Sequence, residues 1–200
     1  MMKIEKRAET IKNWINDYCN NTSFSPKSLI VGISGGIDSS VVSTLCALTG
    51  RKTVVLSLPI KQLNNASFDI VLCALAMHYI EDWNVTIEEF YRILKPNGCL
   101  VISIEHPFFE YNYFKSTQYF SIEPVKCTWS GFGKPVEVPS YRRSLQECIN
   151  PLTNNGFYID QLLEPKPVKE FEKLDPKHYK ELNEFPAFMC IRALKKPTIK

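Results

Sequence analysis

The spacing of hydrophobic positions changes along this chain, and the changes separate predicted helices from predicted strands. Near the amino end, apolar residues recur at steps of three and four from Ile4 to Tyr18, which predicts an amphipathic helix. Further along, short continuous apolar runs bounded by turn residues predict buried strands. Six main strands are expected, at residues 28–33, 53–58, 68–74, 99–104, 157–163 and 188–194.

Further helices are predicted at residues 41–48, 85–94 and 144–152, and a turn is predicted at residues 95–98. A strand, a helix and a second strand joined by short loops form a crossover unit whose strands pair in parallel. The alternation of strands and helices therefore predicts an α/β fold. We expect an open, mostly parallel, Rossmann-like sheet of about six main strands, with helices on both faces.

An aromatic-rich insertion interrupts this alternation after residue 104. Seven aromatic side chains fall within residues 108–120, beginning with Phe108, and Trp129 follows them. Long insertions in compact domains are usually functional, and ligand pockets are lined by aromatic side chains. The insertion is therefore expected to be either a lid over a substrate or a cluster that packs on one end of the sheet.

The composition is typical of a soluble globular protein, with 44% hydrophobic and 22% charged residues. A net charge of +3 is too mild to indicate nucleic acid as a partner. The longest uncharged apolar stretch, residues 70–77, is too short for a membrane span, and residues 1–9 lack a signal-peptide core. Seven dispersed cysteines without a Cys-x-x-Cys pair favour buried free thiols. We therefore expect a cytoplasmic protein.

A candidate phosphate-binding loop, Ser34-Gly-Gly-Ile-Asp-Ser-Ser40, follows the first strand and opens a helix. Glycines there let the backbone approach an anion, and the N–H groups of the first helical turn point toward it. Asp38 would hold a Mg²⁺ ion that bridges phosphate oxygens, or Asp38 or Ser39 simply caps the helix. The predicted nucleotide-binding residues are Ser34, Gly35, Gly36, Asp38, Ser39 and Ser40.

This loop is similar to the pyrophosphate loop of the ATP pyrophosphatase group. Residues 1–62, including Trp14, the loop, Thr49-Gly50 and Ser57-Leu-Pro59, resemble the amino-terminal segment of ammonia-dependent NAD synthetases. The resemblance implies that the loop holds MgATP in a ligase that adenylates a carboxylate and then forms an amide. It covers under a third of the chain, and the later ligand contacts of that family have no matching residues.

Residues 64–200 resemble the carboxyl-terminal portion of class I S-adenosylmethionine-dependent methyltransferases. The matching segments include residues 67–72, Leu75-Ala-Met-His-Tyr79, residues 90–98, Glu105-His-Pro107, residues 141–145, Gly156-Phe157 and Glu164-Pro165. The resemblance implies S-adenosylmethionine as the cofactor and a small-molecule methyl acceptor.

That resemblance also implies which residues line the site. His78 would border cofactor and substrate, and Glu105 and His106 would lie beside the substrate. With Phe108 and Trp129 of the insertion, Glu105 and His106 form the expected substrate pocket. His78 and His106 are the candidate catalytic residues. Each is a single histidine at a strand end, and such a histidine is more often structural than catalytic. Similarity of fold alone is weak evidence for a catalytic role.

Two features of such methyltransferases are missing from residues 1–62. The first strand ends in the ATP-type loop rather than a glycine-rich methionine loop, and the strand at 53–58 is not followed by an acid for the ribose hydroxyls. Three interpretations follow: a methyltransferase-like protein with compromised cofactor binding, an ATP-binding ligase fragment, or an inactive fusion. We expect turnover near background in the isolated chain.

Both parent families use an open parallel sheet in which the first crossover unit occupies the same central positions. A nucleotide-binding fragment, residues 1–62, and a methyltransferase-like part, residues 63–200, are therefore expected to pack as one domain. The six main strands would lie in the spatial order two, one, three, four, six, five.

Overall fold

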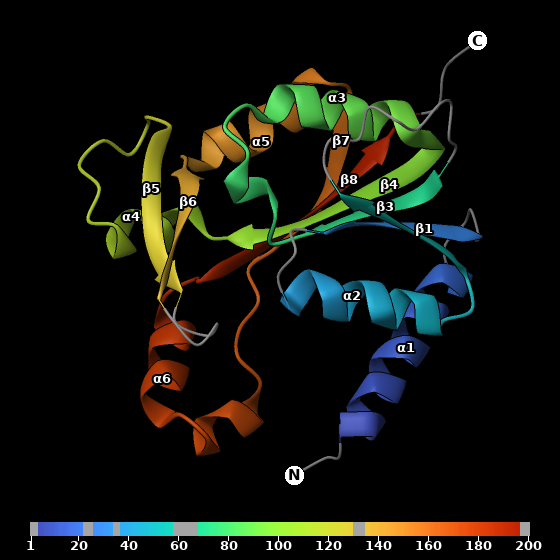
Figure 1. The fold of residues 1–200 in the computed structure, drawn as a ribbon, viewed down its shortest axis with the longest axis horizontal. Coiled ribbons are helices and arrows are strands. Elements are labelled where there is room, and N and C mark those ends of the chain that lie inside the picture. Colours follow the sequence, from blue (N-terminus) through green and yellow to red (C-terminus); the bar gives the residue numbers. More distant parts are fainter. Residues whose placement is uncertain (1–3, 22–25, 34–36, 58–67, 130–134, 197–200) are drawn as a thin grey trace.

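The computed structural model describes residues 4–21, 26–33, 37–57, 68–129 and 135–196. Within these ranges, six strands form one sheet and two further strands form a separate hairpin (Figure 1). The sheet strands are β1 (Ser28–Ile33), β2 (Lys52–Ser57), β3 (Phe68–Ala74), β4 (Leu94–Glu105), β7 (Phe157–Leu163) and β8 (Phe188–Lys195). The hairpin strands are β5 (Glu123–Trp129) and β6 (Val136–Arg142). The helices are α1 (Ile4–Asn21), α2 (Ile37–Leu48), α3 (Trp83–Ile93), α4 (Pro107–Tyr113), α5 (Leu145–Asn154) and α6 (Pro176–Glu184), with short 3-10 helices η2 (Met77–Tyr79) and η3 (Lys169–Lys173).

The strand order of the sheet is β2-β1-β3-β4-β8-β7. β1 pairs in parallel with β2 and β3, and β3 pairs in parallel with β4, whereas β8 is antiparallel to both β4 and β7. One strand therefore runs against the other five. The predicted spatial order and the mostly parallel sheet are both confirmed, because the strands on either side of residue 62 join one continuous ladder.

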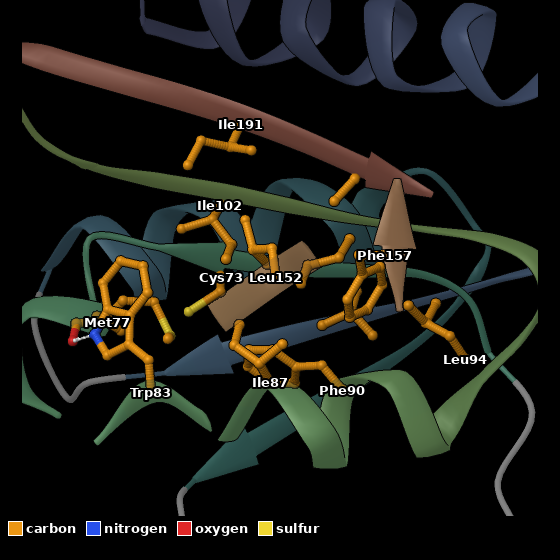
Figure 2. Close-up of a cluster of buried hydrophobic side chains, with 14 of the residues drawn as sticks. Cys73, Met77, Trp83, Ile87, Phe90, Leu94, Ile102, Leu152, Phe157 and Ile191 are labelled. Carbon is orange, nitrogen blue, oxygen red and sulfur yellow. Dashed lines mark hydrogen bonds between the residues drawn. The ribbon is translucent and has the colours of Figure 1, made fainter. Parts of the chain in front are cut away.

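Helices cover both faces of the sheet, as predicted. α3 and α5 lie on one face, and α1 and α2 lie on the other (Figure 1). The larger cluster of buried side chains lies under α3 and α5 and includes Ile87, Phe90 and Leu152 of these helices and Ile102 of β4 (Figure 2). Burial of each such side chain contributes about 1.5–3 kcal/mol to the stability of the fold.

A buried tryptophan anchors this cluster next to the candidate site. The indole Nε1 of Trp83 donates a hydrogen bond of 2.8 Å to the carbonyl oxygen of Met77, which closes the connection between β3 and α3 (Figure 2). The indole N–H of Trp83 thus has a hydrogen-bond acceptor within the apolar core, as buried tryptophans usually do.

The seven cysteines are free thiols, as predicted. Burial raises the pKa of Cys46 to about 11 and the pKa of Cys73 to about 12. Both thiols therefore stay protonated at neutral pH and contribute as apolar packing groups.

The amino-terminal helix is less buried than its apolar spacing suggested. Cys19 is buried and Ile15 and Tyr18 pack on the sheet, whereas Ile4 and Trp14 are exposed. None of the helices in the described ranges has the length and hydrophobicity needed to cross a bilayer.

Two predictions of local structure were wrong. Residues 95–98 form no separate turn: β4 runs through them with a register irregularity and a positive φ of 64° at Asn97. α2 begins at Ile37 rather than at residue 41. Residues 164–187, for which no element was predicted, contain η3 and α6. The chain between β4 and α5 forms α4 and the β5–β6 hairpin.

Gly98 explains why the 95–98 segment can lie so close to the sheet. A Cβ atom at this position would lie 2.9 Å from the carbonyl oxygen of Lys95 and 3.0 Å from that of Asp69. The Lys95 ammonium in turn binds the buried Asp69 carboxylate at 2.9 Å. This close approach of two backbones requires a residue without a side chain.

Candidate functional site

Four strand ends meet at one edge of the sheet, because β1 to β4 are parallel. Their last residues are Ile33, Ser57, Ala74 and Glu105. In open α/β sheets, ligands bind outside the carboxyl ends of the strands. The site predicted from the sequence therefore lies at this edge, which we call the carboxyl edge.

The predicted nucleotide-binding loop lies partly outside the described residues. Ser34, Gly35 and Gly36 are outside them, and the side chains of Asp38 and Ser39 are outside them as well. The backbone of Asp38, Ser39 and Ser40 belongs to the first turns of α2. Nucleotide binding by these residues, and the Mg²⁺ role of Asp38, stay predictions.

Hydroxyl groups further along α2 are used within the helix. The hydroxyl groups of Ser43 and Thr44 donate to the carbonyl oxygen of Ser40, at 2.9 and 2.8 Å. Among the described residues, there is no group of three or more histidine, cysteine or acidic side chains that could hold a metal ion.

His78 lies at the carboxyl edge on η2, just after β3. Its Nδ1 is buried without a hydrogen-bond partner among the described residues, and its ring lies 4.1 Å from that of Tyr79. Burial, with a smaller contribution from the positive charge of Arg143, lowers the pKa of His78 to about 4. The imidazole is therefore neutral at physiological pH and is available to a ligand only as an uncharged donor or acceptor.

His106 lies at the same edge, directly after β4, but both of its ring nitrogens are already bonded. Nδ1 accepts a hydrogen bond of 3.1 Å from the backbone N–H of Phe108 and thereby caps α4. Nε2 donates to the Glu164 carboxylate at 3.0 Å. The ring is therefore a neutral tautomer with its proton on Nε2, and it has no free nitrogen that could accept a proton from a substrate.

Two carboxyl groups lie close to His106, one half-buried and one buried. Glu105 ends β4, and Glu110 follows in α4 with only 4% of its surface exposed. Burial raises the pKa of both, and the nearby charge of Glu105 adds to the effect on Glu110, whose pKa is about 8. Glu110 was missed by the sequence reasoning, although a lone acid within an aromatic-rich segment was the available signal.

Two consecutive arginines, one ending β6 and one directly after it, brace the same region. Arg142 donates to the Glu123 carboxylate at 2.7 Å and to three backbone carbonyl oxygens, those of residues 118, 119 and 121. Arg143 donates to the carbonyl oxygens of residues 80 and 81 and lies over the Trp83 ring at 4.5 Å. From the sequence, these arginines were identified only within the matching segment at residues 141–145, and it was not predicted that they brace this region.

Three of the four residues that the sequence proposes for a substrate pocket lie together, and their role in a pocket stays a prediction. Glu105, His106 and Phe108 lie together, with the Phe108 ring stacked on the His106 ring at 5.9 Å and half of its surface exposed. Trp129 ends β5, and its side chain lies outside the described residues. Phe108 also contacts Tyr119, whose hydroxyl group accepts from the backbone of Leu145.

Comparison with known proteins identifies the fold. The family described as a methyltransferase domain matches residues 38–102. A proposed S-adenosylmethionine-dependent methyltransferase from Listeria monocytogenes superposes with a TM-score of 0.61 at 21% identity, over 94% of this chain and 99% of that one. The S-adenosylmethionine-dependent methyltransferase from Mesorhizobium loti gives 0.56 at 18% identity, over 85% and 91%.

Two further comparisons concern a structure with bound ligands and a curated protein that this chain matches over only part of its length. The Burkholderia thailandensis 1,6-didemethyltoxoflavin N1-methyltransferase, with its substrate and S-adenosylhomocysteine bound, gives a TM-score of 0.52 at 12% identity, over 94% of this chain and 78% of that one. An uncharacterised protein of Haemophilus influenzae is 27% identical over 147 residues, which cover 67% of this chain and 56% of that protein. The chain thus spans just over half the length of this curated relative.

These comparisons correct one prediction from the sequence. The methyltransferase match begins at Asp38 and continues across the expected junction at residues 62–64, so it is not confined to the later part of the chain. The structural matches likewise include most of the chain, and the resemblance of residues 1–62 to NAD synthetases receives no support from them. The chain has the Rossmann-like fold of S-adenosylmethionine-dependent methyltransferases.

Proposed function

We propose that this protein binds S-adenosylmethionine at the carboxyl edge and transfers its methyl group to a small molecule. The observation that carries the proposal is the sheet itself: five strands in one direction, with the antiparallel β8 inserted between β4 and β7. Methyltransferases of known structure are similar in fold to this chain, including one with S-adenosylhomocysteine and 1,6-didemethyltoxoflavin bound.

The residues proposed for the site divide into two halves. The cofactor half consists of the predicted nucleotide-binding residues within 34–40, the end of β2, and His78 just after β3. The acceptor half consists of Glu105, His106, Phe108 and Trp129, which come from the end of β4, the start of α4 and the end of β5. When bound, the cofactor supplies an electrophilic methyl group, and the contribution of the protein is to hold the acceptor in line with it.

The residues present fit the acceptor half better than the cofactor half. β2 contains no acidic residue and ends at Ser57. A missing carboxylate contact to the ribose costs about 1.5–3 kcal/mol, which corresponds to roughly ten- to hundredfold in affinity. We therefore propose weak cofactor binding and slow turnover, in keeping with the expectation from the sequence.

A titration that compares ligands tests this proposal. S-adenosylmethionine and S-adenosylhomocysteine should raise the melting temperature of the protein, because a ligand that binds only the folded state stabilises it. Stabilisation by MgATP alone would contradict the proposal and favour the ligase alternative. No stabilisation by any of the three ligands would contradict it in favour of an inactive protein.

A gain-of-function variant sharpens this test. Ser57→Asp supplies an acid at the carboxyl end of β2 and should tighten S-adenosylhomocysteine binding about tenfold or more, measured by calorimetry. Lys52→Asp is the matched control, because it places the same charge at the opposite end of the same strand. Equal effects of the two variants would show that the ribose does not lie at the end of β2.

A further inference from the structure

His106 joins three segments of the chain that are distant in sequence. Its backbone N–H donates to the carbonyl oxygen of Ala187 at 2.8 Å, just before β8. Its side chain binds the backbone N–H of Phe108 in α4 and the carboxylate of Glu164, just after β7. His106 is 3% exposed, whereas the Glu164 side chain is 53% exposed, so the imidazole is buried while its carboxylate partner faces water.

The contacts of this side chain depend on its charge. In the neutral ring, Nδ1 has a free lone pair and accepts the Phe108 N–H. Protonation places a hydrogen atom on Nδ1, so the ring can then only donate and the cap of α4 is lost. The contact from Nε2 to Glu164 survives protonation and becomes an ion pair. A single proton therefore breaks one contact of His106 and keeps the other.

The surroundings determine which state is present at neutral pH. Burial favours the neutral ring, whereas the negative charge of Glu164, on the segment after β7, favours the protonated ring; the net effect lowers the pKa of His106. The other acids near it are Glu105 on β4 and Glu110 on α4, whose backbone N–H donates to the carbonyl oxygen of His106 at 3.0 Å. His106 is therefore neutral at pH 7, and its protonation requires a more acidic pH than that of an ordinary histidine.

Release of this cap affects the acceptor half of the site. α4 and the β5–β6 hairpin lie together at one end of the large sheet (Figure 1). The Phe108 ring, stacked on the His106 ring, also contacts Tyr119 in the segment that leads to this hairpin. Loss of the Phe108 N–H contact loosens the first turn of α4 and the aromatic ring that it carries.

We infer that His106 is a positioning residue that latches α4 at the carboxyl edge at neutral pH and releases it on protonation. His106 then acts through α4 rather than as the catalytic residue that the sequence offered as a candidate, because the lone pair of its Nδ1 caps the helix. The consequence for substrate access rests on the proposed function. The latch itself is a property of the protein without ligand, so it is tested without activity.

Hydrogen exchange of the full chain carrying Glu110→Gln, between pH 7.5 and pH 5, tests the latch, because Glu110 in α4 would otherwise titrate in the same range. After correction for the intrinsic exchange rate, the protection of amides in residues 108–114 should fall about fivefold in this parent protein, the scale of one helix cap. His106→Asn should remove this pH dependence while keeping α4 protected, because an asparagine side chain can also cap a helix and does not titrate. His106→Ala should leave α4 poorly protected at every pH.

A second variant tests the direction of the coupling to Glu164. Glu164→Gln removes the charge that favours protonation, so the release should shift to lower pH, while the amide oxygen still accepts from Nε2. Protection of α4 that does not change with pH in the Glu110→Gln parent protein, or that changes equally when His106→Asn is added to it, would overturn the latch. Either result is independent of whether the protein binds S-adenosylmethionine.

Discussion

The buried carboxyl group of Glu110 should make the stability of this protein depend on pH in a predictable direction. Its pKa in the folded state is about 8, because burial and the neighbouring Glu105 disfavour the charged form despite the nearby Arg142 and Arg143. The unfolded chain loses the same proton near the ordinary value of 4.5. Stability from the protonated group is therefore fully present below pH 4.5 and is lost as the pH rises toward 8.

The size of this effect follows from the difference between the two pKa values. Each pH unit between them changes the free energy of unfolding by about 1 kcal/mol, so the loss from pH 5 to pH 8 is roughly 3–4 kcal/mol. Glu110→Gln replaces the carboxyl group by a neutral group of the same shape and abolishes this loss. The variant should match the wild type near pH 5 and exceed its stability by about 3 kcal/mol at pH 8.

Urea unfolding at several pH values between 5 and 8 measures this difference directly. Glu137→Gln is the matched control, because Glu137 is an exposed acid on the neighbouring hairpin, paired with Lys126 at 3.1 Å. The control should stay within about 0.5 kcal/mol of the wild type at every pH, as exposed pairs usually do. Parallel curves for the wild type and Glu110→Gln would refute the assignment of a buried, protonated carboxyl group.

Two further substitutions test the architecture of the fold, each measured by the free energy of unfolding. Gly98→Ala should destabilise the protein by about 1–3 kcal/mol, because the new methyl group would overlap the Lys95 carbonyl oxygen; Gly32→Ala should cost less, because its nearest contacts would lie at 3.9 Å. Arg142→Ala should cost about 3 kcal/mol, because it removes a buried donor that Glu123 shares with three carbonyl oxygens. It should also make residues 114–122 the first site of limited proteolysis, and unchanged cleavage there would contradict the bracing role of Arg142.

Much of the sheet could be predicted from the sequence because its strands are short apolar runs separated by clear turn residues. The buried apolar runs of β1, β3 and β4 show this pattern clearly. The crossover between β1 and β2 indicates that these two strands are parallel. The 95–98 segment was mistaken for a turn because its Pro-Asn-Gly pattern is typical of one. The close approach of Gly98 to Asp69, which keeps this segment on the sheet, is a tertiary contact that no local pattern records.

The candidate site was predictable only in outline, because its chemistry depends on pairing across distant segments. His106 was found as a residue at a strand end, but its role follows from contacts with Phe108 and Glu164, the latter 58 residues away. Arg142 likewise acts on carbonyl oxygens more than 20 residues earlier in the chain. Spacing along the sequence indicates which residues share an element, but not which elements meet at the carboxyl edge.

The central claim is that the carboxyl edge is the ligand-binding edge of a methyltransferase-type sheet, and hydrogen exchange with saturating S-adenosylhomocysteine tests it most directly. The account predicts slower exchange in the residues that follow β1 and β3, near Ile33 and His78, since ligands of open α/β sheets bind at these ends. The amino edge of the sheet, where Asp69 binds Lys95, should exchange at the same rate with and without ligand. Protection confined to the amino edge, or no change at the saturating concentration, would contradict the account.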